Sequence, residues 1–108
     1  MADEALFIAE TPLGLRVRVS RERWHLIVTL KHPVMQERED AVRAVLERPD
    51  EVRQSRSAQD ILLFYKLERP KRWMCAVIRR GRGDNEEGFL ITAYPTDAIK
   101  EGTTIWTR

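Results

Sequence analysis

Two histidines, His25 and His32, are the first candidates for chemistry in this chain. An imidazole gains and loses a proton near neutral pH, so a histidine can act as a general base or a general acid. On a helix, the seven-residue spacing places both side chains on nearly the same face, with Thr29 between them. The pair could therefore divide acid and base roles. The alternative is structural, with His25 on the surface and His32 hydrogen-bonded to backbone at a helix end.

A second group of candidates lies on an expected strand over residues 89–94. Side chains alternate between the two faces of a strand. The alternation predicts two sets: Phe89, Ile91 and Ala93 toward the helices, and Leu90, Thr92 and Tyr94 toward the open face. Thr92 and Tyr94 would then display two hydroxyl groups on the face that the helices leave open.

The neighbouring expected strands contribute cations. Lys66 shares a strand face with Leu62 and Phe64, and Arg79 lies near the end of the next strand. We expect Lys66 to reach the same open face as the two hydroxyl groups. A sheet face with hydroxyls, an aromatic ring and cations could hold a phosphodiester and a stacked base. The alternative is ordinary cross-strand packing with solvated strand ends.

Other common site chemistries have little support. The single cysteine, Cys75, lies in an apolar strand and is interpreted as a core residue. One cysteine cannot form an internal disulfide, which is typical of a reducing, cytoplasmic setting. The Gly81-Arg82-Gly83 segment lacks the spacing of a phosphate-binding glycine motif and is expected to be a hairpin tip. No Cys/His cluster suggests zinc, so neither a metal ion nor a cofactor is expected.

Composition favours one folded domain spanning residues 1–108, with 43% hydrophobic and 33% charged residues. No apolar run approaches the roughly 20 residues of a membrane span, and the acidic start Met1–Glu4 lacks the basic region of a signal peptide. A membrane partner is therefore not expected. Arginine makes up 15 of the 19 basic residues. Guanidinium groups match phosphate geometry, although a GC-rich genome produces the same bias and the net charge is only +2.

Local patterns predict the elements that would position these residues. Ser20 is a suitable N-cap for a helix that begins at Arg21 and ends at His32-Pro33, although residues 24–30 are also rich in strand formers. The other expected elements are a hairpin of strands 6–9 and 15–19, a helix over 36–48, a polar turn-like segment over 49–59, and strands over 61–67, 73–80 and 89–94. This order predicts an α+β fold, with two helices packed on one face of a curved antiparallel sheet and strand 89–94 near its middle.

An ordered set of short segments resembles a phage- and mobile-element-associated family of nucleases. These are grouped with barnase, EndoU, colicin and RelE-type nucleases as the BECR fold. The matching segments are Glu22-Arg23-Trp24, Ile27 and His32-Pro33, then Pro49–Val52, Leu62–Lys66 and Ala76–Ile78, and finally Ile91–Tyr94, Thr96, Ile99–Gly102 and Ile105-Trp106. They span roughly residues 14 to 108, almost the whole chain.

The resemblance implies a toxin-like, metal-independent endoribonuclease that works on a phosphodiester with polar residues of the sheet face. From the matched segments it implies roles for His32, Lys66, Thr92 and Tyr94. Helical geometry adds His25, and the strand end adds Arg79 as a stabiliser of phosphorane charge. The alternative is a catalytically inactive module of the same fold that binds RNA or an antitoxin-like protein partner.

Overall fold

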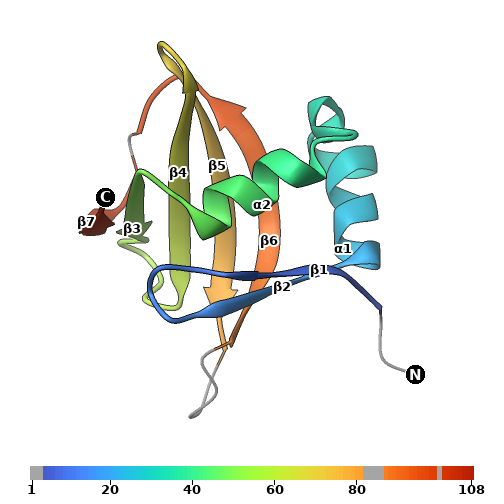
Figure 1. The fold of residues 1–108 in the computed structure, drawn as a ribbon, viewed down its shortest axis with the longest axis horizontal. Coiled ribbons are helices and arrows are strands. Elements are labelled where there is room, and N and C mark those ends of the chain that lie inside the picture. The colour runs from blue at the N-terminus through green and yellow to red at the C-terminus, as the bar shows by residue number, and fades with distance from the viewer. Residues whose placement is uncertain (1–3, 82–86, 100) are drawn as a thin grey trace.

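The computed structural model describes residues 4–81, 87–99 and 101–108 and has an α+β fold with helices on one face of a sheet (Figure 1). The strands are β1 (Ala5–Glu10), β2 (Arg16–Ser20), β3 (Glu51–Gln54), β4 (Ile61–Arg69), β5 (Arg72–Arg80), β6 (Glu87–Thr96) and β7 (Thr103–Thr107). The helical segments are α1 (Arg21–Leu26), the π-helix η1 (Ile27–Lys31), the 3-10 helix η2 (Pro33–Met35) and α2 (Glu39–Glu47). Within the described ranges, no helix has the length and apolar character required to cross a membrane.

The seven strands form one sheet in the order β1-β2-β6-β5-β4-β3-β7. The predicted N-terminal hairpin is confirmed as the antiparallel pair β1–β2. The sheet is not wholly antiparallel as expected, because β2 and β6 pair in parallel. Strand β6 pairs with β2 on one side and β5 on the other, so its predicted place near the middle of the sheet is confirmed. The expected hairpin tip at Gly81-Arg82-Gly83 extends outside the described residues.

The first helical region begins at the predicted cap, since the Oγ of Ser20 accepts a hydrogen bond from the backbone N–H of Arg23 at 3.0 Å. Residues 24–30 are helical and not a strand, but the expected single α-helix becomes a π-helix at Ile27. The wider turns close with the His32 N–H donating to the Ile27 carbonyl at 2.7 Å. Branched residues in this stretch lower its α-helical preference. The Thr29 hydroxyl also donates to the carbonyl of residue 25, a bond that competes with regular helix geometry.

The second helix is shorter than the predicted 36–48 because the chain turns before it. Glu37 adopts a left-handed conformation with φ 64°, which interrupts a helix at that point. Helix α2 then starts with Glu39 and Asp40, two acidic residues that interact favourably with the positive end of the helix dipole. It buries Val42 and two further apolar residues against the sheet.

The main core lies between the helices and one face of the sheet, which we call the helix face. Helix α2 packs across β4, β5 and β1, while α1 contacts β1, β2 and β6 (Figure 1). The fully buried side chains of this core include Leu15, Val17, Val19, Ile27, Met35, Val42, Val45, Leu46, Leu62, Phe64, Met74 and Ile78. A smaller buried cluster of Leu63, Tyr65 and Cys75 lies on the opposite, helix-free face, and Ile99 packs against it. The prediction that Cys75 is a core residue is confirmed.

Strands β3 and β7 were not predicted. Strand β3 occupies part of the expected turn-like segment and buries only Val52. It pairs with β4 on one side and β7 on the other. A short strand with one buried residue shows almost no alternation of apolar and polar residues. The strands with which it pairs, and not its own sequence, therefore determine where it forms.

A β-bulge in β6 overturns part of the face assignment. The register with β5 shifts between Val77, which pairs with Thr92, and Ile78, which pairs with Leu90, leaving Ile91 as the extra residue. A bulge inverts the alternation on one side of it. Leu90 is therefore buried in the helix-side core, and Phe89 points to the helix-free face with 46% of its surface exposed. Both placements are the reverse of those predicted from simple alternation.

Candidate nucleic-acid interface

One cross-strand row on the helix-free face alternates aliphatic or aromatic residues with arginines. It consists of Ile8, Arg18, Phe89, Arg79 and Ile61, which are direct register partners on β1, β2, β6, β5 and β4. We call it the Arg–Phe row. Its central residue is a half-exposed phenylalanine with an arginine on each neighbouring strand, an arrangement that a hydrophobic core does not require.

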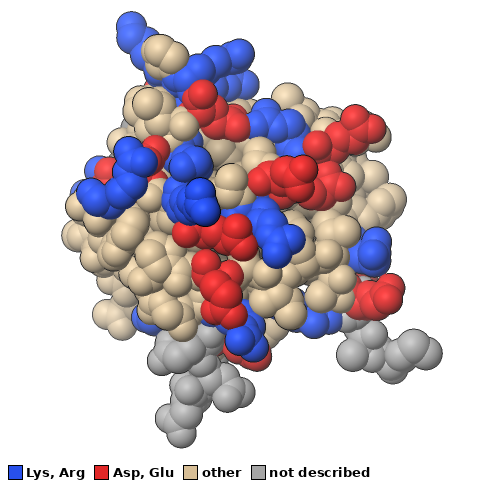
Figure 2. Space-filling view, viewed as in Figure 1, with Lys and Arg blue, Asp and Glu red and all other residues tan. Residues whose placement is uncertain are grey.

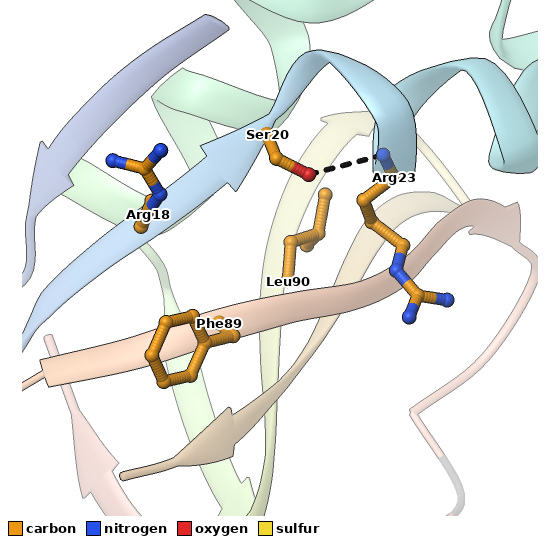
Figure 3. A pocket seen from close by; sticks show the side chains of 5 residues that line it. All are labelled: Arg18, Ser20, Arg23, Phe89 and Leu90. Carbon is orange, nitrogen blue, oxygen red and sulfur yellow. Dashed lines mark hydrogen bonds between the residues drawn. The ribbon is translucent and has the colours of Figure 1, made fainter. Parts of the chain in front are cut away.

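The Arg–Phe row borders a pocket where β2 and β6 separate (Figure 3). Strand β2 ends at Ser20 and continues directly into α1, so the parallel ladder stops at the pair of Arg18 and Phe89. The resulting hollow of about 290 Å³ is lined by Arg18, Ser20, Arg23, Phe89 and Leu90. Arg18 on β2 and Arg23 on α1 lie on two sides of the space above β6 (Figure 3). The hydrogen bond to the Ser20 cap fixes the turn that carries Arg23.

Arg79 is held only loosely within the protein. Arg79 lies 3.9 Å from Asp60, and both side chains are largely exposed, so this ion pair is weak. Guanidinium groups form planar, bidentate contacts with phosphate oxygens. An exposed aromatic ring beside them offers a stacking surface for a nucleobase. The row therefore combines the two contacts that single-stranded nucleic acid requires.

Two rows further along β6, tyrosines flank Cys75 on the same face. Tyr65, Cys75 and Tyr94 are direct register partners on β4, β5 and β6. We call these three residues the Tyr–Cys–Tyr row. Burial raises the pKa of the Cys75 thiol to about 11, although its interactions with the phenols of Tyr94 and Tyr65 oppose the increase. Burial and the neighbouring thiol also raise the pKa of both tyrosines well above the ordinary phenol value. All three groups are therefore protonated at neutral pH.

His32 reaches one end of this row. Its ring centroid is 5.2 Å from that of Tyr94, with the planes tilted by 38°. The contact comes from the end of η1, which lies beside β6 where β2 no longer covers its edge. The His32 ring thus touches a protonated phenol at the rim of the helix-free face.

Thr92 lies between the two rows, opposite Val77. Its Oγ1 is buried and has no hydrogen-bond partner among the residues that the structure describes. A buried hydroxyl without a partner costs free energy. It is therefore an unmet hydrogen-bonding group on the helix-free side of the sheet, covered by its neighbours in the free protein.

Of the six predicted site residues, four lie on or at this face: Arg79, Thr92 and Tyr94 from the sheet, and His32 through its contact with Tyr94. They do not all converge on one point, because Arg79 belongs to the Arg–Phe row and Tyr94 to the other. The expected helix-free face is thus confirmed for Thr92 and Tyr94, and Arg79, whose face was not predicted, lies on it as well.

The placement of Lys66 was wrong. Lys66 follows Leu62 and Phe64 on the helix face of β4, and its Nζ donates to the carbonyl of Arg48 at 2.8 Å. Residues 62–65 are all buried, so both faces of this strand are apolar and the sequence does not reveal which one the helices cover. Lys66 caps the end of α2 and does not reach the hydroxyl groups of β6.

The expected pairing of His25 with His32 is also not found. His25 is exposed on α1, and within the described part of the chain its side chain makes no hydrogen bond or ring contact. The π-helical turns between the two histidines change the angular spacing on which the prediction depended. The two residues therefore do not form an acid–base pair with each other.

Sequence reasoning missed Arg18, Arg23 and Phe89 as site residues. The alternation of apolar and basic residues in 15–19 did indicate an exposed strand face. It could not indicate that this strand pairs in parallel with β6, and this pairing is what places Arg18 beside Phe89. Among the described residues, no group of three or more His, Cys, Asp or Glu side chains is placed to hold a metal ion.

In comparisons with known proteins, no family model matches this sequence, and no curated protein or solved structure matches it.

Proposed function

We propose that this protein binds single-stranded RNA on the helix-free face, with the Arg–Phe row as the central contact. The observation that carries the proposal is the exposed ring of Phe89 between register partners Arg18 and Arg79. The ring would stack on a base while the guanidinium groups hold the flanking phosphates. Arg23 would add a third cation from across the pocket.

Thr92 supports RNA over DNA within this proposal. It follows Phe89 along the same face of β6, with the bulge residue between them. Its buried oxygen lacks a donor among the described residues, and a ribose 2′-hydroxyl that displaced the side chains covering it would supply one. A deoxyribose would leave that oxygen unsatisfied. We extend the proposal to the fold and infer that the chain has the BECR-type fold that the family resemblance implies. Helices packed on one face of a sheet are the coarser feature of that fold.

The test is binding of fluorescently labelled 12-nucleotide RNA measured by anisotropy at several salt concentrations. Phe89→Ala should weaken binding by roughly 5- to 150-fold, the range of a lost base–aromatic stack. Ile105→Ala is the matched control, because Ile105 on β7 is 45% exposed against 46% for Phe89. Arg79→Gln should lower the slope of log affinity against log salt by about 1. Arg43→Gln makes the same charge change on α2, on the other side of the sheet, and should not lower the slope.

RNA binding that is absent, or independent of salt, would contradict this proposal and leave an antitoxin-like protein as the candidate partner. Equal losses from Phe89→Ala and Ile105→Ala would show that the Arg–Phe row is not the binding surface.

The contact of His32 with Tyr94 supports a second candidate function, metal-independent RNA cleavage. In this reaction the 2′-hydroxyl attacks the adjacent phosphorus, a base removes its proton, and an acid protonates the departing 5′ oxygen. His32 would remove the 2′-hydroxyl proton and deliver it to the departing 5′ oxygen, and the neutral phenol of Tyr94 would donate a hydrogen bond to the charged phosphorane. Arg79 shares the face but lies two rows away, so binding has stronger support than cleavage.

Cleavage is tested by incubating labelled RNA with the protein in excess EDTA and looking for 2′,3′-cyclic phosphate ends. We expect His32→Ala to lower the rate by at least about 100-fold, the usual contribution of a general acid or base. The absence of these products with wild-type protein over a range of RNAs would remove the cleavage hypothesis while leaving RNA binding intact.

A further inference from the structure

A second basic hollow lies at the tip of the β4–β5 hairpin, away from the Arg–Phe row. It has a volume of about 250 Å³ and is lined by Arg38, Glu68, Arg69 and Arg72. Figure 2 shows Lys and Arg side chains gathered over this turn, at the top of the view, with few acidic residues among them. The hairpin brings Arg69 and Arg72 together as register partners, and Arg38 approaches from just before α2.

The charges of this hollow are unbalanced. Arg38 forms an ion pair with Glu68, and this is the single carboxylate that lines the hollow. None of the ion pairs among the described residues includes Arg69 or Arg72. Like charges at directly opposed positions of two strands repel each other. Two positive charges therefore remain without an acidic partner in a space that one small anion can enter.

The turn itself carries a conformational cost. Lys71 has φ 61°, a left-handed conformation that glycine adopts without strain. It follows Pro70 at the tip and brings a further cation next to Arg72. Strained residues persist where the surrounding structure or a function requires them. The two-residue turn between Arg69 and Arg72 accounts for the positive φ of Lys71, and it holds the charge of this lysine at the tip of the hairpin.

We propose that Arg38, Arg69 and Arg72 form a binding site for a phosphoryl group, which is either free phosphate or the terminal phosphate of an oligonucleotide. Guanidinium forks bind tetrahedral oxyanions through paired N–H donors. A phosphate dianion would neutralise the two charges that Glu68 leaves uncompensated. The site does not depend on the helix-free face, since it is built from other residues.

The test is isothermal titration of the full chain with inorganic phosphate at constant ionic strength. The variants are Arg72→Gln and the double variant Arg69→Gln/Arg72→Gln. We expect a tenfold weakening in the single variant and loss of detectable binding in the double variant. Arg43→Gln, which makes the same charge change on α2, should bind phosphate as the wild type does. The circular dichroism spectrum and the melting temperature establish that each variant is folded.

A second arm compares 5′-phosphorylated and 5′-hydroxyl RNA of one sequence, using protein that carries Phe89→Ala. A preference of tenfold or more for the phosphorylated strand that disappears with Arg69→Gln/Arg72→Gln assigns the site to nucleic-acid ends. Binding of inorganic phosphate without this preference assigns it to free phosphate. Unchanged phosphate binding in the double variant, or no binding of either probe by the wild type, would overturn the proposal. Because Phe89→Ala should weaken binding to the Arg–Phe row and not to this site, failures of the two proposals are distinguishable.

Discussion

A substitution at Thr92 can distinguish a structural role of its buried hydroxyl from a role in binding. Its Oγ1 has no described partner, so in the free protein the hydroxyl contributes a desolvation cost without a compensating bond. We predict that Thr92→Val, which replaces the hydroxyl by a methyl group of similar size, stabilises the free protein by about 1 kcal/mol. Urea unfolding followed by circular dichroism measures the change. The same variant should bind RNA more weakly, because a 2′-hydroxyl then loses its acceptor.

Thr104→Val is the control for this substitution. The Thr104 hydroxyl donates to Glu51 at 2.6 Å, so its removal should destabilise the protein by about 0.5–1 kcal/mol. Loss of stability in both variants would mean that the Thr92 hydroxyl is satisfied in solution, and the argument for its availability to ligand would fail.

The corrected position of Lys66 gives a second prediction at the residue scale. Lys66→Met removes the ammonium group that donates to the Arg48 carbonyl and keeps the length of the aliphatic chain. We expect a loss of about 0.5–1 kcal/mol in the free energy of unfolding, the typical net value of one hydrogen bond. RNA affinity and any cleavage rate should remain within about twofold of the wild type at equal fractions folded. A large loss of either activity with intact stability would restore Lys66 to the functional site.

At the scale of elements, β7 depends on a backbone position that only glycine fits. Gly102 precedes β7 with φ 83°, and a Cβ atom there would lie 2.6 Å from the carbonyl oxygen of Gln54 on β3. We predict that Gly102→Ala destabilises the protein by about 2 kcal/mol or more, because strain and backbone overlap add. Hydrogen exchange should show the amides of β7 losing protection before those of β5.

Gly14 provides the matched comparison, since it has φ 75° and nothing lies within 4 Å of an added Cβ. Gly14→Ala should therefore cost only the conformational strain, about 1 kcal/mol. Equal effects at the two positions would show that the close approach to β3 is relieved by a small shift of the chain.

The elements divide into those that local sequence specifies and those that depend on a partner. The Ser20 cap, the apolar spacing of α2 and the β1–β2 turn are local signals, and each predicted its element. Strands β3 and β7 have too few buried residues to be recognised from sequence. They form because β3 pairs with β4 and β7 pairs with β3. The β6 bulge depends on the register with β5, which no pattern within residues 87–96 encodes. For the same reason Thr92 and Tyr94 could be assigned to the helix-free face while Phe89 could not.

At the scale of the whole molecule, the sheet separates two environments. The helix face holds the main core, and the helix-free face holds a smaller buried cluster bordered by the exposed Arg–Phe row. The Tyr–Cys–Tyr row crosses three neighbouring strands at the centre of the smaller cluster. Its burial is a consequence of the complete fold, since it requires β4, β5 and β6 in register and Ile99 packed against them.

Because of the Tyr–Cys–Tyr row, the free energy of unfolding depends on pH in the alkaline range. Burial raises the pKa of Cys75 from an ordinary value of 9.0 to about 11, and it raises the pKa of Tyr65 and Tyr94 further above the phenol range. Each group is neutral when protonated, and the folded state holds the proton more tightly than the unfolded state. Below pH 9 both states are protonated and the groups have no effect. As pH rises above 9, the unfolded chain loses protons that the folded chain retains, so the free energy of unfolding must fall.

We therefore predict that the free energy of unfolding falls as pH rises from 9 to 11, by at most about 1.4 kcal/mol per pH unit for each titrating group. Urea unfolding at fixed ionic strength, at half-unit pH intervals, measures the slope. Cys75→Ala lowers the free energy of unfolding at every pH. It should also flatten the decline between pH 9 and 10, because Cys75 is the first of the three groups to lose its proton in the unfolded chain. Tyr94→Phe should act mainly above pH 10, where phenols of the unfolded chain ionise. If both variants keep the wild-type slope over the whole interval, the thiol and phenol are accessible to water, and the packing of Ile99 over the row does not persist in solution.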